Sequence, residues 1–252
     1  MEVHAHTHTT APDSHRGRKK WTHYFWEFLM LFLAVFCGFL AENIREHQVE
    51  KHRENQYIRS LIEDLGEDTL ALAASVSELG PNVQRLDTLL HLLSSSDVKD
   101  HGADLYSLGR KASRGNTLAL HDRTIQQMKN SGSFRLITNE PVSKAILEYY
   151  NQLRFMNHLE ATELNETTEY RKMVIHIFHP VIFDSIVMPD DNIVKPAGNP
   201  ALLTYDPAVL LHLGGMVAYI KNTRLGFLKA EERMSLSAKS LIALLKKEYH
   251  LN

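Results

Sequence analysis

The chain has 252 residues and a formal net charge of -2, from 28 Lys and Arg residues against 30 Asp and Glu residues. This balance excludes a generally basic nucleic-acid-binding protein, and a hydrophobic content of 44% excludes a wholly disordered chain. The single cysteine, Cys37, excludes an intrachain disulfide framework and any zinc or iron–sulfur site built from several cysteines.

Residues 1–20 lack apolar periodicity and combine histidines with basic residues, so we predict a disordered His-rich basic tail. His4, His6 and His8 alternate and His15 follows, a pattern that can bind a divalent transition metal when the imidazoles are neutral. No neighbouring carboxylate orients these rings, which favours weak adventitious affinity over a dedicated metal site.

Residues 21–41 form the most apolar stretch of the chain. At 1.5 Å per residue they make a helix of roughly 31 Å, which matches the hydrocarbon core of a bilayer. Trp21, Tyr24 and Trp26 gather at one end, where a membrane interface would lie, and no charge occurs over residues 28–41. A buried core helix is the first alternative, but this stretch is apolar on all faces. A signal peptide is the second, but a good cleavage site is missing. We therefore predict an uncleaved transmembrane helix.

Glu27 interrupts the apolar stretch near its start and lies four residues after His23, on the same helix face. An ionisable residue in a membrane helix is costly. In the simpler interpretation the carboxylate reaches the headgroups or is protonated. A contact with a partner helix is the better of two functional alternatives, the other being a proton-linked role.

Basic residues flank the apolar stretch on both sides. Four precede it as a tight group, namely Arg16, Arg18, Lys19 and Lys20. The four that follow within about 20 residues alternate with glutamates, so the tighter group favours a cytoplasmic N-terminus. Residues from about 42 onward would then lie outside the cytoplasm, and their lack of cysteine suits an oxidising compartment.

Residues 42–56 mix opposite charges on all faces and predict a solvated helical stalk. A helical domain follows over residues 57–252. Its first helix shows an apolar stripe in which two rows recur every seven residues: Ile58, Leu65, Leu72 and Leu79, then Ile62, Thr69, Val76 and Val83. Gly80-Pro81 predicts the end of this helix, and a second helix as far as Leu93 would fold back as an antiparallel hairpin.

Shorter elements follow. Leu105 and Leu108 indicate a weak helix, and residues 118–129 predict another that ends at Asn130-Ser131-Gly132. A long helix is expected over residues 140–178, since Asn139 is a suitable N-cap. Its apolar stripe comprises Val142, Ile146, Tyr149, Leu153, Met156, Leu164 and Met173.

Prolines mark residues 181–205 as a loop, with a short extended piece at 181–187. Asp206-Pro207 caps a last helix that runs almost to the C-terminus. Its coiled-coil-like seam comprises Val209, Leu213, Met216, Ile220, Thr223, Phe227, Met234, Ala238, Leu241 and Leu245. The apolar runs at 175–188 and 209–220 are too short to cross a bilayer, so we expect one membrane pass. The predicted fold is all-α: one N-terminal transmembrane helix continuing into a stalk, then a bundle of long antiparallel helices.

Two stretches resemble a family of bacterial single-pass membrane proteins known only as a domain of unknown function. The first combines Glu27, the stalk from Glu42 and the sequence ENQYIRSLIEDL over residues 54–65, with Ile58 where Leu is usual. The second is residues 125–139, with the Ser131-Gly132 turn before a helix. Together they cover about a quarter of the chain. The resemblance implies a membrane-anchored helical domain in a bacterium and brings no catalytic residues with it.

Short catalytic motifs are missing from the sequence, including a phosphate-binding glycine loop, a dinucleotide fingerprint and a nucleophile elbow. His176 and His179, with Glu169 on about the same face, could share a metal, but Pro180 favours a structural role at a helix end. Ser131-Gly132-Ser133 suits a turn better than a nucleophile. We therefore assign no catalytic, cofactor-binding or metal-ligating residue and expect no enzyme.

The sequence favours a membrane-anchored helical scaffold or interaction protein. Its expected partners are the lipid bilayer and a protein, or a second copy, contacted through the membrane helix and the long helices; nucleic acid is not expected. The alternative is a membrane-tethered sensor that binds a small ligand and acts through a separate partner. The expected location is the bacterial inner membrane, with the N-terminus cytoplasmic and the C-terminal domain periplasmic.

Overall fold

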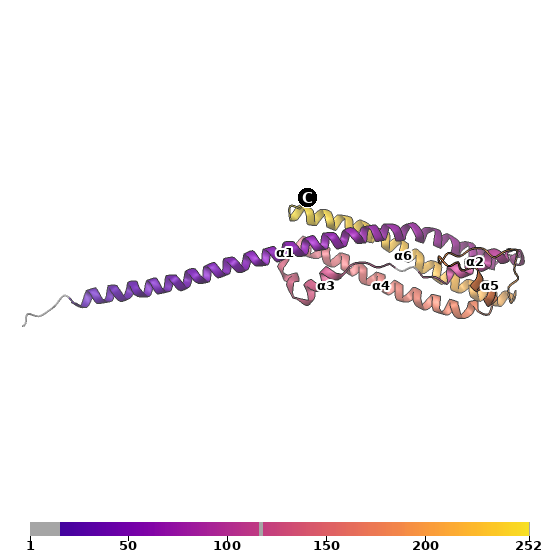
Figure 1. Cartoon of the computed structure of the whole chain (residues 1–252), viewed down its shortest axis with the longest axis horizontal. Helices are drawn as coiled ribbons and strands as arrows, with labels where there is room; N and C mark the ends of the chain where they lie inside the picture. The colour runs from indigo at the N-terminus through magenta and orange to yellow at the C-terminus, as the bar shows by residue number, and fades with distance from the viewer. Residues whose placement is uncertain (1–15, 116–117, 252) are drawn as a thin grey trace, which may run out of the picture. The chain divides into compact units, whose positions relative to one another are not determined.

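The computed structural model describes residues 16–115 and 118–251, with side chains described from Trp21 onward. These residues are mostly helical and form no strand, so the all-α prediction is confirmed (Figure 1). The elements are α1 (Arg16–Leu93), η1 (Val98–His101), α2 (Gly102–Ala112), α3 (Arg123–Asn130), η2 (Ser133–Leu136), α4 (Glu140–Val174), α5 (Pro180–Ser185) and α6 (Pro207–Glu248).

The His-rich part of the tail, residues 1–15, lies outside the described residues, and with it His4, His6, His8 and His15. Helix α1 begins at Arg16, within the segment expected to be disordered. The described chain divides into two units, before and after the junction of Arg53 and Glu54, and each is described by itself.

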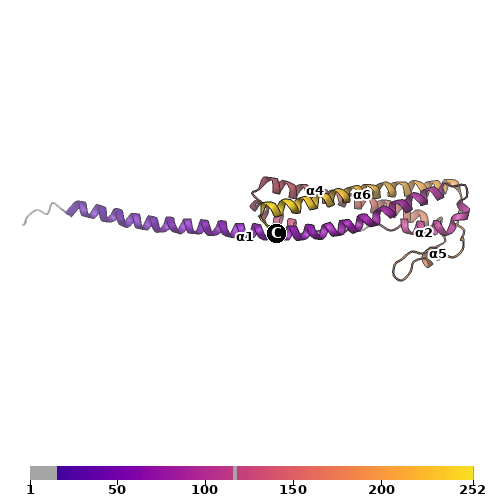
Figure 2. The ribbon, with the colours of Figure 1, turned by 90° about the horizontal axis from the view of Figure 1, so that it is seen from above.

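The second unit is built on three long helices: α1 from Glu54 onward, α4 and α6. The two views agree that these helices lie side by side (Figures 1 and 2). Helix α6 runs antiparallel to α1, because the Tyr249 hydroxyl donates to Glu54 at 2.6 Å while Lys221 pairs with Asp87 at 2.8 Å. Helix α4 runs parallel to α1, since the segment from η1 to η2 carries the chain back before α4 begins.

The predicted break at Gly80-Pro81 is wrong, and so is the hairpin that it implied. Helix α1 continues through Pro81 to Leu93. The reason is tertiary packing, because the seven-residue apolar repeat continues in the same phase beyond the proline. Its members are 0–4% exposed: Ile58, Leu65, Leu72, Leu79, Leu86 and Leu93. Burial on both sides of Pro81 outweighs the roughly 3 kcal/mol that a proline costs inside a helix.

The second row of the α1 seam also differs from the prediction. Ile62, Thr69, Val76 and Val83 are only half-buried. The buried row stands one position earlier and contains Leu61, Asp68, Ser75 and Leu89. Two of these four side chains are polar, which conceals the row from an analysis of apolar periodicity.

Helices α4 and α6 begin where they were expected. The Asn139 side chain accepts a hydrogen bond from the Val142 amide at 3.2 Å, and the Asp206 side chain accepts one from the Ala208 amide at 2.9 Å. Leu164 was assigned to the α4 stripe, but it is 62% exposed. The stripe turns away at that point because Glu163 and Thr167 take the buried positions.

The short elements pack at both ends of the bundle, α3 with the first cluster of the core and α2 with the second. Helix α3 begins at Arg123, five residues later than predicted, and α4 ends at Val174. Residues 180–185 form helix α5 instead of an extended piece, because Pro180 suits a first helical turn. Gly109 lets α2 approach the Phe178 ring, where an added Cβ would meet a ring carbon at 2.7 Å.

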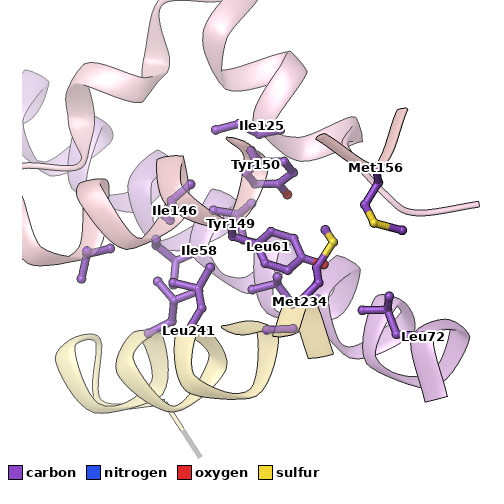
Figure 3. Packing of buried hydrophobic residues seen from close by; sticks show 14 of the residues in the cluster. Ile58, Leu61, Leu72, Ile125, Ile146, Tyr149, Tyr150, Met156, Met234 and Leu241 are labelled. Atoms are coloured by element: carbon purple, nitrogen blue, oxygen red, sulfur yellow. The ribbon is translucent and has the colours of Figure 1, made fainter. Parts of the chain in front are cut away.

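The core of the second unit consists of two apolar clusters, one toward each end of the bundle. Figure 3 shows the first, in which Ile58 and Leu61 of α1 pack with Ile146 and Tyr149 of α4 and with Leu241 of α6. Charged side chains are buried in the same seams, and these residues form the candidate site.

Candidate functional site

In the first unit, helix α1 presents its apolar side chains outward. The large apolar side chains from Trp21 to Leu40 are 41–82% exposed, Leu29 excepted. The rings of Phe28, Phe32 and Phe36 stack along one face, with centroids 6.3 and 5.9 Å apart. This segment is long and apolar enough to cross a membrane, and none of its apolar window is buried. Such a surface needs cover that the described chain does not supply.

Glu27 and Cys37 both lie exposed on this segment. Following it, Arg45 makes a surface ion pair with Glu42 at 2.5 Å. The role of Glu27 stays a prediction.

A buried ion pair stands in the seam of the second unit. Arg224 of α6 donates from Nε to Glu163 of α4 at 2.7 Å, and both side chains are no more than 4% exposed. The Arg224 guanidinium also donates to the backbone carbonyls of Ala112 and Arg114, which ties the end of α2 to α6. Removing one member of such a pair would leave an uncompensated buried charge.

Two further carboxyls lie on the same two helices, Glu166 on α4 and Glu231 on α6. Glu166 accepts a hydrogen bond from Thr223 at 3.0 Å, and burial raises its pKa, with Glu163 adding to the rise. Glu231, one heptad after Arg224 on α6, is fully buried. Arg224 opposes the rise in the pKa of Glu166, but burial outweighs this effect.

Glu231 is the exceptional member of the group. Neither of its carboxyl oxygens has a hydrogen bond of standard geometry, and the polar group that faces it from α1 is the Ser75 hydroxyl. Burial raises the pKa of Glu231 to about 7; the Ser75 hydroxyl opposes the rise and the charge of Glu163 adds to it. The side chain therefore changes charge near neutral pH.

Glu231 also lines a cavity of about 210 Å³. The walls come from the segment before α3, from α4 and from α6, and the described lining residues are Leu118, Ala119, Leu120, Asp122, Leu153, Met156, Asn157, Glu160, Phe227 and Glu231. Three of these residues are acidic, and none is cationic.

Two aspartates of α1 hold the segment before α3. Asp68 accepts from the Tyr149 hydroxyl at 2.7 Å and from the backbone amide of His121 at 2.7 Å. Asp64 accepts from the Thr124 hydroxyl at 2.6 Å and from Arg123 at 2.9 Å. Burial opposes ionisation of Asp64, but these hydrogen bonds outweigh it and lower its pKa. Both carboxylates accept hydrogen bonds that hold the fold together, whereas the carboxyl group of Glu231 does not.

The residues considered for a metal site do not come together. His176 and His179 are exposed, and Glu169 pairs with Lys172 at 2.7 Å. Within residues 16–115 and 118–251, no three His, Cys, Asp or Glu side chains are close enough to hold a metal ion. Ser131-Gly132-Ser133 forms a turn, in which Gly132 has a positive φ of 69°.

Sequence reasoning missed the buried charges, although a signal was present. On α6 the buried row with a period of seven contains Leu210, Val217, Arg224, Glu231, Ala238 and Leu245. A charged residue in phase with an apolar repeat predicts a buried polar layer.

None of the family models, curated proteins and solved structures compared with the chain matches it. The resemblance to a family of bacterial membrane proteins therefore stays a prediction.

Proposed function

We propose that this protein is a membrane-anchored helical scaffold or interaction protein without catalytic activity. The observation that supports it is the continuity of α1, which carries the exposed apolar segment and also supplies one of the three long helices of the second unit. An apolar helix of this length is able to attach the chain to a bilayer.

The inner membrane of a bacterium is the proposed location, with the N-terminus in the cytoplasm. The tight group of basic residues before the apolar segment supports this orientation. The partner would be a protein, or a second copy, reached through the membrane helix or the outer faces of the bundle. The long seams are filled within the chain, so those outer faces are the surfaces open to a partner.

A specific observation favours a second function, that of a ligand sensor. The cavity beside Glu231 lies in a core to which α1 contributes Ser75. A ligand that changed the charge of Glu231 would act directly on a group that faces α1.

The anchor is tested by substituting Leu31→Lys and Val35→Lys together, since both side chains are 68% exposed in the apolar segment. Each lysine costs about 2.5–3.5 kcal/mol at the centre of a membrane helix, so the double variant should leave the membrane fraction after alkaline carbonate extraction. Leu70→Lys is the matched control, because Leu70 is 74% exposed in the second unit. A native chain that is extracted by carbonate without detergent would contradict the anchor.

Orientation is tested with an impermeant thiol reagent on a Cys37→Ser, Ser96→Cys variant. Ser96 is exposed after α1, so its replacement should be labelled once the outer barrier of intact cells is opened. Labelling that requires a broken inner membrane would reverse the orientation. A defined protein that co-purifies in mild detergent, and that retrieves this chain reciprocally, would support the scaffold over the sensor.

A further inference from the structure

The cavity beside Glu231 has the size of a small-molecule site. Its volume is about 210 Å³. An apolar protein cavity of about 150 Å³ is large enough to bind benzene. The cavity can therefore hold a compact molecule of about eight non-hydrogen atoms.

The lining divides into an acidic part and an apolar part. Among the acidic residues, Glu160 is exposed, Asp122 is half-buried and Glu231 is fully buried. Met156 and Phe227, each 5% exposed, supply apolar walls. A molecule that fits both parts has a positive charge at one end and a compact hydrocarbon body.

Glu231 is the observation that points to a ligand. The other buried carboxylates of the second unit have charged or hydroxyl donors at 2.6–2.9 Å, such as Arg224 for Glu163 and Tyr149 for Asp68. The carboxyl group of Glu231 has no such donor at standard geometry on either oxygen, although it is fully buried and lines the cavity. A buried carboxylate that lacks a strong donor is costly unless a partner neutralises it.

A metal ion fits this lining poorly. The described residues offer no set of three ligating side chains at metal distance, and the apolar walls cannot replace the waters of a hydrated cation. An ammonium group needs only two or three acceptors, and an aromatic face such as that of Phe227 attracts it further.

We propose that this cavity binds a small organic ammonium ion, with Glu231 as its principal carboxylate and Asp122 and Glu160 completing the acidic side. The bound ammonium group donates hydrogen bonds to Glu231, while the hydrocarbon body packs on Met156 and Phe227. The inference goes beyond the scaffold role and does not rest on the membrane anchor. It names the ligand class that the sensor alternative needs.

Benzylammonium is a suitable probe, since it has eight non-hydrogen atoms, and benzyl alcohol has the same size without the charge. Full-length protein in a non-ionic detergent is titrated with each compound by calorimetry, with a detergent blank. Benzylammonium should bind and benzyl alcohol should not. Glu231→Gln should weaken benzylammonium at least tenfold, whereas Glu169→Gln, an exposed change elsewhere on α4, should leave the affinity unchanged.

The affinity should also rise roughly tenfold between pH 6 and pH 8, because Glu231 ionises over this range while the probe stays protonated. This rise should be absent in Glu231→Gln. Equal binding of the two compounds would mean an apolar cavity only and would overturn the proposal. So would an absence of binding, or a Glu231→Gln variant that binds like the native protein. The binding test is independent of the membrane anchor. A native chain that carbonate extracts would contradict the anchor without changing the expected binding of benzylammonium.

Discussion

Replacement of Glu231 by glutamine should stabilise the protein, and the gain should depend on pH. The side chain is fully buried in the α6 seam, and it faces Ser75 of α1 and Glu163 of α4. Asp122 and Glu160 face the same cavity. Glutamine has nearly the shape of a protonated glutamate but carries no charge at any pH.

The magnitude follows from the pKa. The pKa of Glu231 rises from 4.5 to about 7 because of burial. A raised carboxyl pKa stabilises the fold below the unfolded value, and that contribution is lost as the pH rises through the folded value. One pKa unit corresponds to about 1.36 kcal/mol. Relative to strong acid, the contribution of Glu231 to the free energy of unfolding therefore falls by about 1 kcal/mol at pH 5 and by about 3 kcal/mol at pH 8. Glu231→Gln avoids this loss.

Thermal unfolding followed by circular dichroism in detergent measures the difference. A gain of 2 kcal/mol from pH 5 to pH 8 corresponds to about 4–8 °C in the melting temperature of a domain of this size. Glu160→Gln is the control, because this exposed residue lines the same cavity and its replacement should change the melting temperature little. A Glu231→Gln variant with the same shift at both pH values, or one less stable at pH 8, would refute the reasoning.

Gly66→Ala should stabilise the domain by about 0.5–1 kcal/mol in urea unfolding, since an added Cβ meets nothing within 4 Å and alanine favours the helix; a loss would mean that α1 needs its glycine there. Gly109→Ala should destabilise it, because the added Cβ meets the Phe178 ring at 2.7 Å, and an unchanged midpoint would contradict that packing. Arg224→Met should cost about 3–5 kcal/mol by leaving Glu163 buried without its partner. A cost below 1 kcal/mol, as for an exposed pair, would show that the Arg224 pair is not desolvated.

Sequence reasoning succeeded where the cause of a structure lies within a few residues. Asn139 and Asp206 cap their helices through amides two or three positions later, so the motif and its hydrogen bond are visible together. Gly80-Pro81 is an equally local signal, but it failed because Leu79 and Leu86 are buried by residues far along the chain. Tertiary packing of these leucines therefore outweighed the tendency of Gly80-Pro81 to end the helix.

The candidate site was beyond local analysis for the same reason. Asp68 meets His121 and Tyr149 at separations of 53 and 81 residues, and Arg224 meets Glu163 at a separation of 61. No short motif contains two of these partners. The heptad spacing of the charged residues was visible in the sequence. The partner of each charge, however, depends on which helices pack together, and the segment from η1 to η2 between α1 and α4 decides this.

The buried charges also explain how helices with repetitive seams keep one register. Apolar packing with a period of seven changes little when one helix slips by a heptad, but such a slip would move Glu163 about 10 Å along the axis from Arg224. It would separate Asp68 from Tyr149 as well, and each unpaired buried charge costs several kcal/mol. The polar residues thus select a register that leucines alone would leave open. Because α1 contributes Asp68 to this selection, the helix that carries the exposed apolar segment is held in a single register within the core.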